Sequence, residues 1–223
     1  MWSIAKSVLL ILSALFPIVD PLGGAPIFLA LTRDNTTSER RTLSWRIAVN
    51  SFFLIIGSYL IGTHVLAFFG ISIPVVQVGG GLVVAAAGWA MLNRPAEEEE
   101  DDRVQTHREM KTKDPLRHAF YPLTLPLTVG PGSISVAITL GANVPHPEGI
   151  RAFAIIAALI GAALISVSIF LCYGFSDRLA RALGKTGMTV FVQLASFLLV
   201  CIGVQIFWNG ASALLGSVLN GAR

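Results

Sequence analysis

The residue with the clearest chemical potential is Asp20, which stands inside the apolar segment FPIVDPLGGAP at residues 16–26. A charge at the centre of a membrane costs about 2.5–3.5 kcal/mol or more, so an acidic residue in such a segment is typically functional. Asp20 could take up and release a coupling proton, or its carboxylate could pair with a substrate ammonium group. It could also only cap a broken helix. The sequence leaves all three roles open.

The segment around Asp20 is repeated in the second half of the chain. Residues 121–131 read YPLTLPLTVGP and align without gaps with residues 16–26. Asp20 aligns with Leu125, so the repeat itself does not require the acid. Three prolines fall in register, namely Pro17 with Pro122, Pro21 with Pro126, and Pro26 with Pro131. A weaker match, at a spacing that needs an insertion between the motifs, aligns Gln77 with Gln193 and Asn93 with Asn209.

Proline and glycine are expected to unwind both segments, because proline removes a backbone donor and glycine frees the chain from helical geometry. In hydrocarbon, unpaired backbone groups are costly, so such breaks persist only where they line a protein cavity. Half-helices are expected to begin at about Ala25 and Ser133, with free N–H groups directed toward an anion or carboxylate near the midplane. Asp20 is the candidate for ion coupling, and the candidate substrate-binding residues are Asp20, Gly23, Gly24, Ala25, Thr128, Gly130, Gly132 and Ser133.

The composition indicates that the segments carrying these motifs lie in a lipid membrane. Hydrophobic residues make up 54% of the 223 residues and charged residues 13%, against roughly 45–50% and about 25% in soluble domains. The mean hydropathy is +0.71, and the pI is near 9.1. Such a chain is neither a soluble globule nor, despite its basic pI, a nucleic-acid-binding protein. Apolar segments long enough to cross a bilayer cover about 4–31, 47–69, 73–93, 118–142, 152–174 and 188–216.

The basic residues predict the orientation of these six spans. Thirteen of the 16 Lys and Arg residues lie in the loops after the first, third and fifth spans, and only Lys6, Arg151 and Arg223 lie on the other side. The positive-inside rule then makes those loops cytoplasmic and both termini periplasmic. We expect a three-helix repeat at 1–93, a charged cytoplasmic linker at 94–117 with an acidic run at 97–102, and a second three-helix repeat at 118–223. Three spans per repeat make the halves inverted.

Four ordered motifs resemble the MarC family along essentially the whole chain: FPIVDPLGGAPIFLAL, FGISIPVVQVGGG, PLTVGPGSI and FLLVCIGVQIFWNG. The family is grouped with neutral amino acid transporters, near the lysine-exporter superfamily. The resemblance implies six helices in a bacterial inner membrane and transport of small neutral amino acids coupled to an ion gradient. It also implies that two motifs are central, one with Asp20, Pro21 and Gly23, the other with Gly130, Pro131 and Gly132.

This chain departs from the usual family pattern at three positions. Many members carry Asn where this chain has Gly24, and Arg where it has Gln77 and Gln193. Without those arginines, Asp20 has no obvious fixed cationic partner. The departures therefore favour protonation or substrate pairing of Asp20 over a permanent salt bridge.

The leading interpretation is an integral membrane secondary transporter of small neutral amino acids, driven by a proton or sodium gradient. Its alternatives are an exporter of other small metabolites and a non-transporting membrane scaffold. The sequence shows no carbonyl-filter motif or ring of charged residues, which a channel would need. It contains no HExxH motif and no paired intramembrane aspartates for an intramembrane enzyme, and no GxxxxGK(S/T) loop for an ATP-driven pump. We therefore expect no catalytic residue, metal, cofactor or nucleic-acid partner. The expected partners are the amino acid, the coupling ion and lipid, and a homo-oligomer is left open.

Overall fold

The computed structural model describes residues 4–32, 35–93, 119–144 and 148–221, and within these ranges the chain is helical and contains no strand. The expected linker at 94–117, with its acidic run at 97–102, lies outside the described residues. In chain order the elements are α1 (Ile4–Val19), α2 (Pro21–Leu31), α3 (Thr37–Phe68), α4 (Ile73–Asn93), η2 (Phe120–Thr128), α6 (Pro131–Ala142), α7 (Glu148–Gly174) and α8 (Ser176–Gly221).

Up to six stretches of the described chain are long and apolar enough to cross a membrane. The pair η2 and α6 forms one of them and is bent by 64° at its break. The first span passes through α1 and α2, which are separated at Asp20. The prediction of an all-helical membrane protein is therefore confirmed, with five candidate spans, or the predicted six if η2 and α6 count as one, and both the first and the fourth predicted spans are discontinuous. The five other stretches are Ile4–Leu29, Thr37–Phe68, Ile73–Asn93, Ala152–Gly174 and Val192–Ser217.

The second helix is longer than the predicted span at 47–69, because α3 begins at Thr37. The Thr36 hydroxyl accepts a hydrogen bond from the Glu39 N–H at 3.3 Å, and the Glu39 carboxylate accepts one from the Thr36 N–H at 2.8 Å. This capping box satisfies N–H groups that a helix start leaves free. The polar first turns of α3 therefore form a stable helix ahead of the apolar part, which starts at Ile47.

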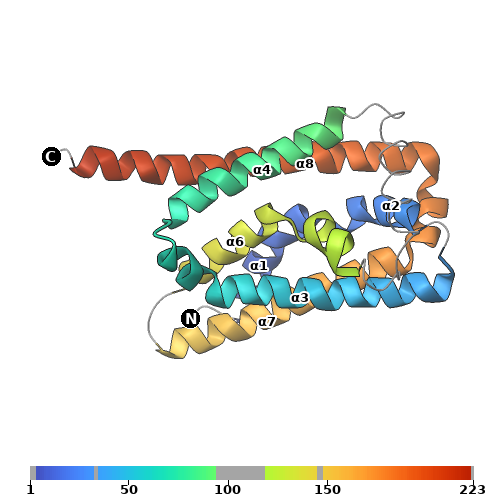
Figure 1. Cartoon of the computed structure of the whole chain (residues 1–223), viewed down its shortest axis with the longest axis horizontal. Helices are drawn as coiled ribbons and strands as arrows, with labels where there is room; N and C mark the ends of the chain where they lie inside the picture. The colour runs from blue at the N-terminus through green and yellow to red at the C-terminus, as the bar shows by residue number, and fades with distance from the viewer. Residues whose placement is uncertain (1–3, 33–34, 94–118, 145–147, 222–223) are drawn as a thin grey trace.

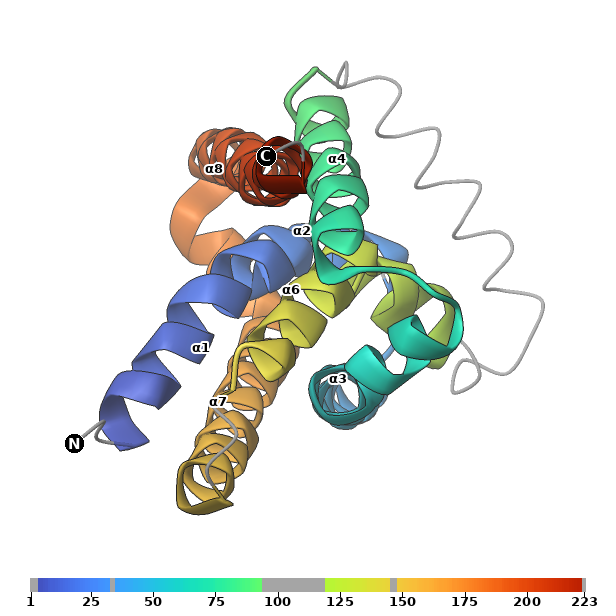
Figure 2. The same ribbon diagram turned by 90° about the vertical axis from the view of Figure 1, so that its left-hand side faces the viewer.

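The helices form three layers (Figures 1 and 2). The two broken spans, α1–α2 and η2–α6, lie in the middle, with α3 and α7 on one side and α4 and α8 on the other. The buried core joins the middle layer to α3 and α7, through fully buried side chains that include Leu15, Phe28, Ile47 and Ile165. The breaks at Asp20 and Gly130 therefore lie between the two outer layers, and the start of η2, at Phe120 and Tyr121, is exposed.

Helices α4 and α8 make the most extensive contact in the molecule. They approach so closely at glycines that a Cβ at Gly81 would overlap backbone atoms of Gly203 and Phe207, and a Cβ at Gly88 would lie 2.8 Å from the Ser196 carbonyl oxygen. Small residues permit such close packing of membrane helices, where van der Waals contact replaces the hydrophobic effect as the driving force. Gly81 and Gly88 of α4 thus serve helix packing.

The two chain ends lie at one end of the helix bundle, and the connections after α2 and α7 lie at the other (Figure 1). At that second end, the Arg40 guanidinium of α3 donates to both carboxylate oxygens of Asp177, at 2.5 and 2.6 Å. Helix α8 then bends at Gly184, whose φ of 63° lies in the left-handed region that glycine adopts without steric cost. The ion pair ties the start of α3 to the start of α8, so these two connections lie side by side.

Candidate functional site

The first break is a single residue. Asp20 has φ 41° and ψ 64°, and it directly precedes Pro21, which disfavours helical geometry in the residue before it. Its N–H donates to the Phe16 carbonyl at 2.9 Å, and its own carbonyl accepts from the Gly24 N–H at 3.0 Å. Asp tolerates the left-handed conformation better than most residues. Helical hydrogen bonds thus reach the break from both sides, and the ladder is interrupted only over the first residues of the next helix, Pro21 to Gly23.

The side chain of Asp20 caps the helix that follows. Its Oδ1 accepts a hydrogen bond from the Gly23 N–H at 3.0 Å. A Cβ at Gly23 would overlap the same carboxylate, so Gly23 leaves the room that the cap needs. The helix-capping role considered for Asp20 is therefore present in the structure. The cap occupies one oxygen of this partly buried carboxylate, and the carboxylate keeps its negative charge.

The expected start of the first half-helix, at about Ala25, is wrong. Helix α2 begins at Pro21, which occupies the first helical position where proline is favoured because its missing N–H is not needed. Gly23, Gly24 and Ala25 therefore lie inside the helix, and Ala25 is completely buried. The N–H groups available at this end belong to Leu22 and Gly23, and Asp20 already caps Gly23.

The second break is spread over several residues. Leu125 is extended, with φ −117° and ψ 120°, directly before Pro126, as a residue before proline is expected to be. The surrounding segment η2 is a π-helix, in which the Val129 N–H donates to the Thr124 carbonyl at 2.8 Å. The hydroxyls of Thr124 and Thr128 donate to carbonyls five residues earlier, at 2.6 and 2.7 Å. Threonine hydroxyls thus occupy carbonyls that the regular ladder would otherwise use.

Helix α6 starts at this second break without a side-chain cap. Its N-cap is Gly130, in extended conformation, and Pro131 takes the first helical position. Gly132 and Ser133 follow, and both are buried. Such a start leaves the N–H groups of Gly132 and Ser133 without intrahelical acceptors. The predicted start at about Ser133 is close to the observed one, and the predicted breaks at 20–25 and 126–132 contain Asp20 and Gly130.

The start of α6 lies next to the end of α1. A Cβ placed on Gly132 would lie 3.7 Å from a methyl group of Ile18, and it would overlap the side chain of Val84 on α4. Ile18 is two residues before Asp20. The uncapped helix start and the capped one are therefore neighbours in the middle layer, and the missing side chain of Gly132 lets α1 and α4 approach it.

Tyr173 of α7 links the two broken spans. Its hydroxyl lies 3.0 Å from the Thr128 Oγ1, and a Cβ at Gly24 would overlap that hydroxyl. Its ring stacks on Phe28 of α2, with centroids 4.8 Å apart and planes 12° from parallel. Tyr173 is 1% exposed. No pattern in the sequence singled out Tyr173, because a tyrosine near the end of a span is usually an interfacial aromatic.

The site thus combines a partly buried acid, an uncapped helix start and a tyrosine bridge. Gly24 and Thr128 meet at the Tyr173 hydroxyl, and the N–H of Gly24 donates to the carbonyl of Asp20. Gln77 lies elsewhere, against Gly210 in the contact between α4 and α8. Among the described residues, no three His, Cys, Asp or Glu side chains gather where they could hold a metal ion. Such an arrangement offers an acidic position at Asp20 and, at the neighbouring start of α6, N–H groups that can bind an anion.

Six apolar spans, two of them broken inside the protein, define a polytopic integral membrane protein. The family model for MarC family integral membrane proteins matches residues 5–215. The chain therefore belongs to the MarC family. It is 33% identical over 212 residues to the inner membrane protein MarC of Salmonella typhimurium, covering 94% of this chain and 96% of that one.

Two further relatives show how far this similarity extends. The inner membrane protein MarC of Citrobacter koseri is 34% identical over 213 residues, covering 94% of this chain and 96% of that one. The membrane protein YvbG of Bacillus subtilis is 30% identical over 197 residues, covering 88% and 90%. No solved structure matches the chain. The family match at residues 5–215 covers both broken spans, and the names of the relatives assign no substrate.

Proposed function

We propose that the protein is a secondary transporter of small neutral amino acids in a bacterial inner membrane, driven by a proton or sodium gradient. The observation that carries the proposal is the pairing of two helix starts within the membrane, one capped by the carboxylate of Asp20 and the other, at Gly130, without a side-chain cap. Half-helices that start inside a membrane are a recurrent device of secondary transporters, where they bind substrates and ions near the midplane.

The charges of the site match a zwitterionic substrate. A carboxylate would bind at the N–H groups of Gly132 and Ser133, where the helix dipole favours negative charge. The ammonium group would lie toward Asp20, or Asp20 would carry the coupling proton. Gly24 and Gly132 keep the surroundings narrow, since side chains of neighbouring helices occupy the space where a Cβ would be. This crowding favours substrates with small side chains.

The pattern of helix contacts supports two inverted repeats. If α1, α2, α3 and α4 correspond to η2, α6, α7 and α8, then the contact of α3 with α6 corresponds to that of α7 with α2, and the contact of α3 with η2 corresponds to that of α7 with α1. The contact of α4 with α6 likewise corresponds to that of α8 with α2. The contact between α3 and α7 and the contact between α4 and α8 each correspond to themselves when the two repeats are exchanged. The chain ends share one side of the bundle (Figure 1), which we assign to the periplasm from the basic loops.

The test is transport by purified protein in proteoliposomes. Labelled glycine or alanine should exchange against the unlabelled amino acid in counterflow, and should accumulate when a proton or a sodium gradient is imposed separately. The gradient that drives accumulation identifies the coupling ion. A protein that folds, binds none of the small neutral amino acids and gives no counterflow would overturn the proposal in favour of a scaffold or a different substrate.

A further inference from the structure

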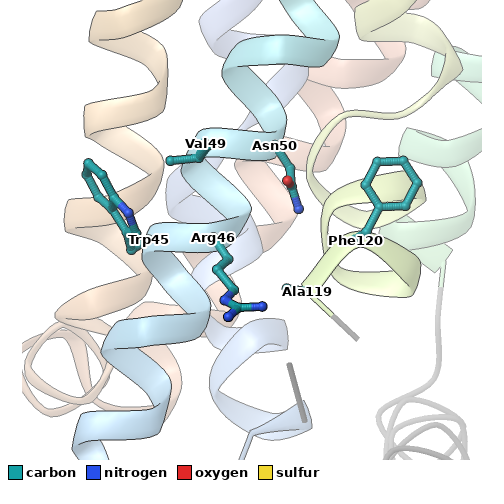
Figure 3. A pocket seen from close by; sticks show the side chains of 6 residues that line it. All are labelled: Trp45, Arg46, Val49, Asn50, Ala119 and Phe120. Carbon is teal, nitrogen blue, oxygen red and sulfur yellow. The ribbon is translucent and has the colours of Figure 1, made fainter. Parts of the chain in front are cut away.

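A hollow of about 340 Å³ lies between α3 and η2, away from the residues of the transport site. It is lined by Trp45, Arg46, Val49 and Asn50 of α3 and by Ala119 and Phe120. Figure 3 shows the side chains of Arg46 and Asn50 directed from α3 toward the side where Ala119 and Phe120 lie. The volume falls within the range of small-ligand sites. None of the assigned or proposed roles of the protein uses it.

The lining of this hollow favours an anion with several oxygens. Among the six described residues that line it, Arg46 is the one charged side chain and there is no carboxylate. The guanidinium presents several N–H donors in a planar fork that matches phosphate geometry. Asn50 adds an amide whose Nδ2 donates one hydrogen bond to Thr124 Oγ1, at 3.4 Å, and has a second N–H to offer. A phosphate could therefore accept hydrogen bonds from both side chains.

The level of the hollow relative to the bilayer indicates that a lipid supplies this phosphate. Arg46 directly precedes Ile47, where the apolar part of α3 begins. The aromatic side chains around it are exposed on the outer surface: Trp45 is 59%, Phe120 50% and Tyr121 65% exposed. Exposed aromatic residues of this kind mark the headgroup level of a bilayer. Basic pockets between membrane helices at this level suit anionic headgroups.

We propose that this hollow binds the phosphate headgroup of an anionic phospholipid. The bound lipid would bridge α3 to the start of the broken fourth span, because Arg46 and Asn50 lie on α3 and Ala119 and Phe120 lead into η2. Asn50 connects the hollow to η2 through its hydrogen bond to Thr124. Lipid occupancy would thus stabilise the fold around the second break. The proposal does not depend on the transported substrate.

The experiment uses the full chain in nanodiscs of phosphatidylcholine alone, and in nanodiscs with one part phosphatidylglycerol to three parts phosphatidylcholine. Phosphatidylglycerol should raise the melting temperature of the wild type. Arg46→Gln should lose most of that rise and should bind phosphatidylglycerol about tenfold more weakly or worse in native mass spectrometry, as expected when charge-assisted hydrogen bonds are removed. Arg46→Lys, which keeps the charge without the fork, should fall between the two.

Arg41→Gln is the matched control, because Arg41 is also an exposed arginine of α3 but does not line the hollow. Arg41→Gln should keep the full rise in melting temperature that phosphatidylglycerol produces. An equal loss in both variants would mean general surface charge and would overturn the proposal, as would an unchanged rise in Arg46→Gln. Inorganic phosphate that protects the protein in phosphatidylcholine equally well, through Arg46, would contradict a lipid ligand. Arg46-dependent protection by alanine would instead make the hollow an entry point for substrate.

Discussion

The two broken spans solve the same steric problem in different ways. Each contains three prolines in register, yet the first breaks at one residue, whose N–H and carbonyl both keep their helical partners. The second spreads its irregularity over Leu125, Val129 and Gly130 and bends by 64°. The difference follows from where the next helix starts: α2 begins at Pro21 and is capped by Asp20, whereas α6 begins at Pro131, the counterpart of Pro26, and its N-cap Gly130 has no side chain. The second helix start is therefore the one left open to a ligand.

The largest effect is expected where the first break meets Tyr173. Gly24→Val should destabilise the protein by about 1–3 kcal/mol, as overpacking of a tight core does, because the new side chain would overlap a buried hydroxyl. Thermal unfolding in detergent measures the change. Gly79→Val is the control, since nothing lies within 4 Å of a Cβ at Gly79. Equal melting temperatures of the two variants would contradict the close contact between α2 and α7.

The cap at the first break comes next in size. Asp20→Ala should lower stability by about 0.5–2 kcal/mol, the usual loss when an N-cap residue is replaced by alanine. Asp20→Asn should restore most of this loss, because asparagine also caps helices and tolerates the left-handed conformation. Denaturation of both variants separates the cap from the charge. Equal destabilisation by Ala and Asn would mean that the charge itself holds the first break together.

The tyrosine bridge between the two breaks is expected to have a smaller effect. Tyr173→Phe should cost about 0.5–1.5 kcal/mol, the net value of an ordinary hydrogen bond. Thr128 keeps its bond to the Leu123 carbonyl in that variant, so no buried hydroxyl is left unpaired. A double-mutant cycle with Thr128→Val should give a coupling energy between the two positions. Strict additivity would show that the bridge does not link the breaks.

The smallest effect on stability, with a large effect on binding, is expected at the second break. Gly130→Ser would give α6 the side-chain cap that it lacks, and serine differs from glycine at an N-cap by only a few tenths of a kcal/mol. Its hydroxyl would compete for the N–H groups proposed for the substrate carboxylate. Apparent substrate affinity should therefore fall, while the control Gly130→Ala should leave it nearly unchanged. If both variants bind normally, the substrate carboxylate binds elsewhere.

The fold was largely predictable from the sequence, because apolar length and proline position act locally. The six spans and both broken helices follow from composition and from residues such as Pro21 and Pro131. The start of α2 was predicted four residues too late, since the sequence does not show that Asp20 adopts φ 41° and that Pro21 therefore opens the helix. Tyr173 was missed because its role depends on tertiary packing against Gly24 and Thr128, which no local pattern encodes.

The central claim is that the charge of Asp20 serves transport in addition to capping α2, and the most direct test is Asp20→Asn in proteoliposomes. Asparagine keeps the size and the cap but can neither cycle a proton nor pair with an ammonium group. The account predicts normal melting with loss of gradient-driven accumulation, together with about thirtyfold weaker binding or worse if Asp20 pairs with the substrate. Asp177→Asn, at the end of the bundle, should still accumulate substrate. Wild-type driven accumulation by Asp20→Asn would contradict the account and leave Asp20 as a helix cap alone.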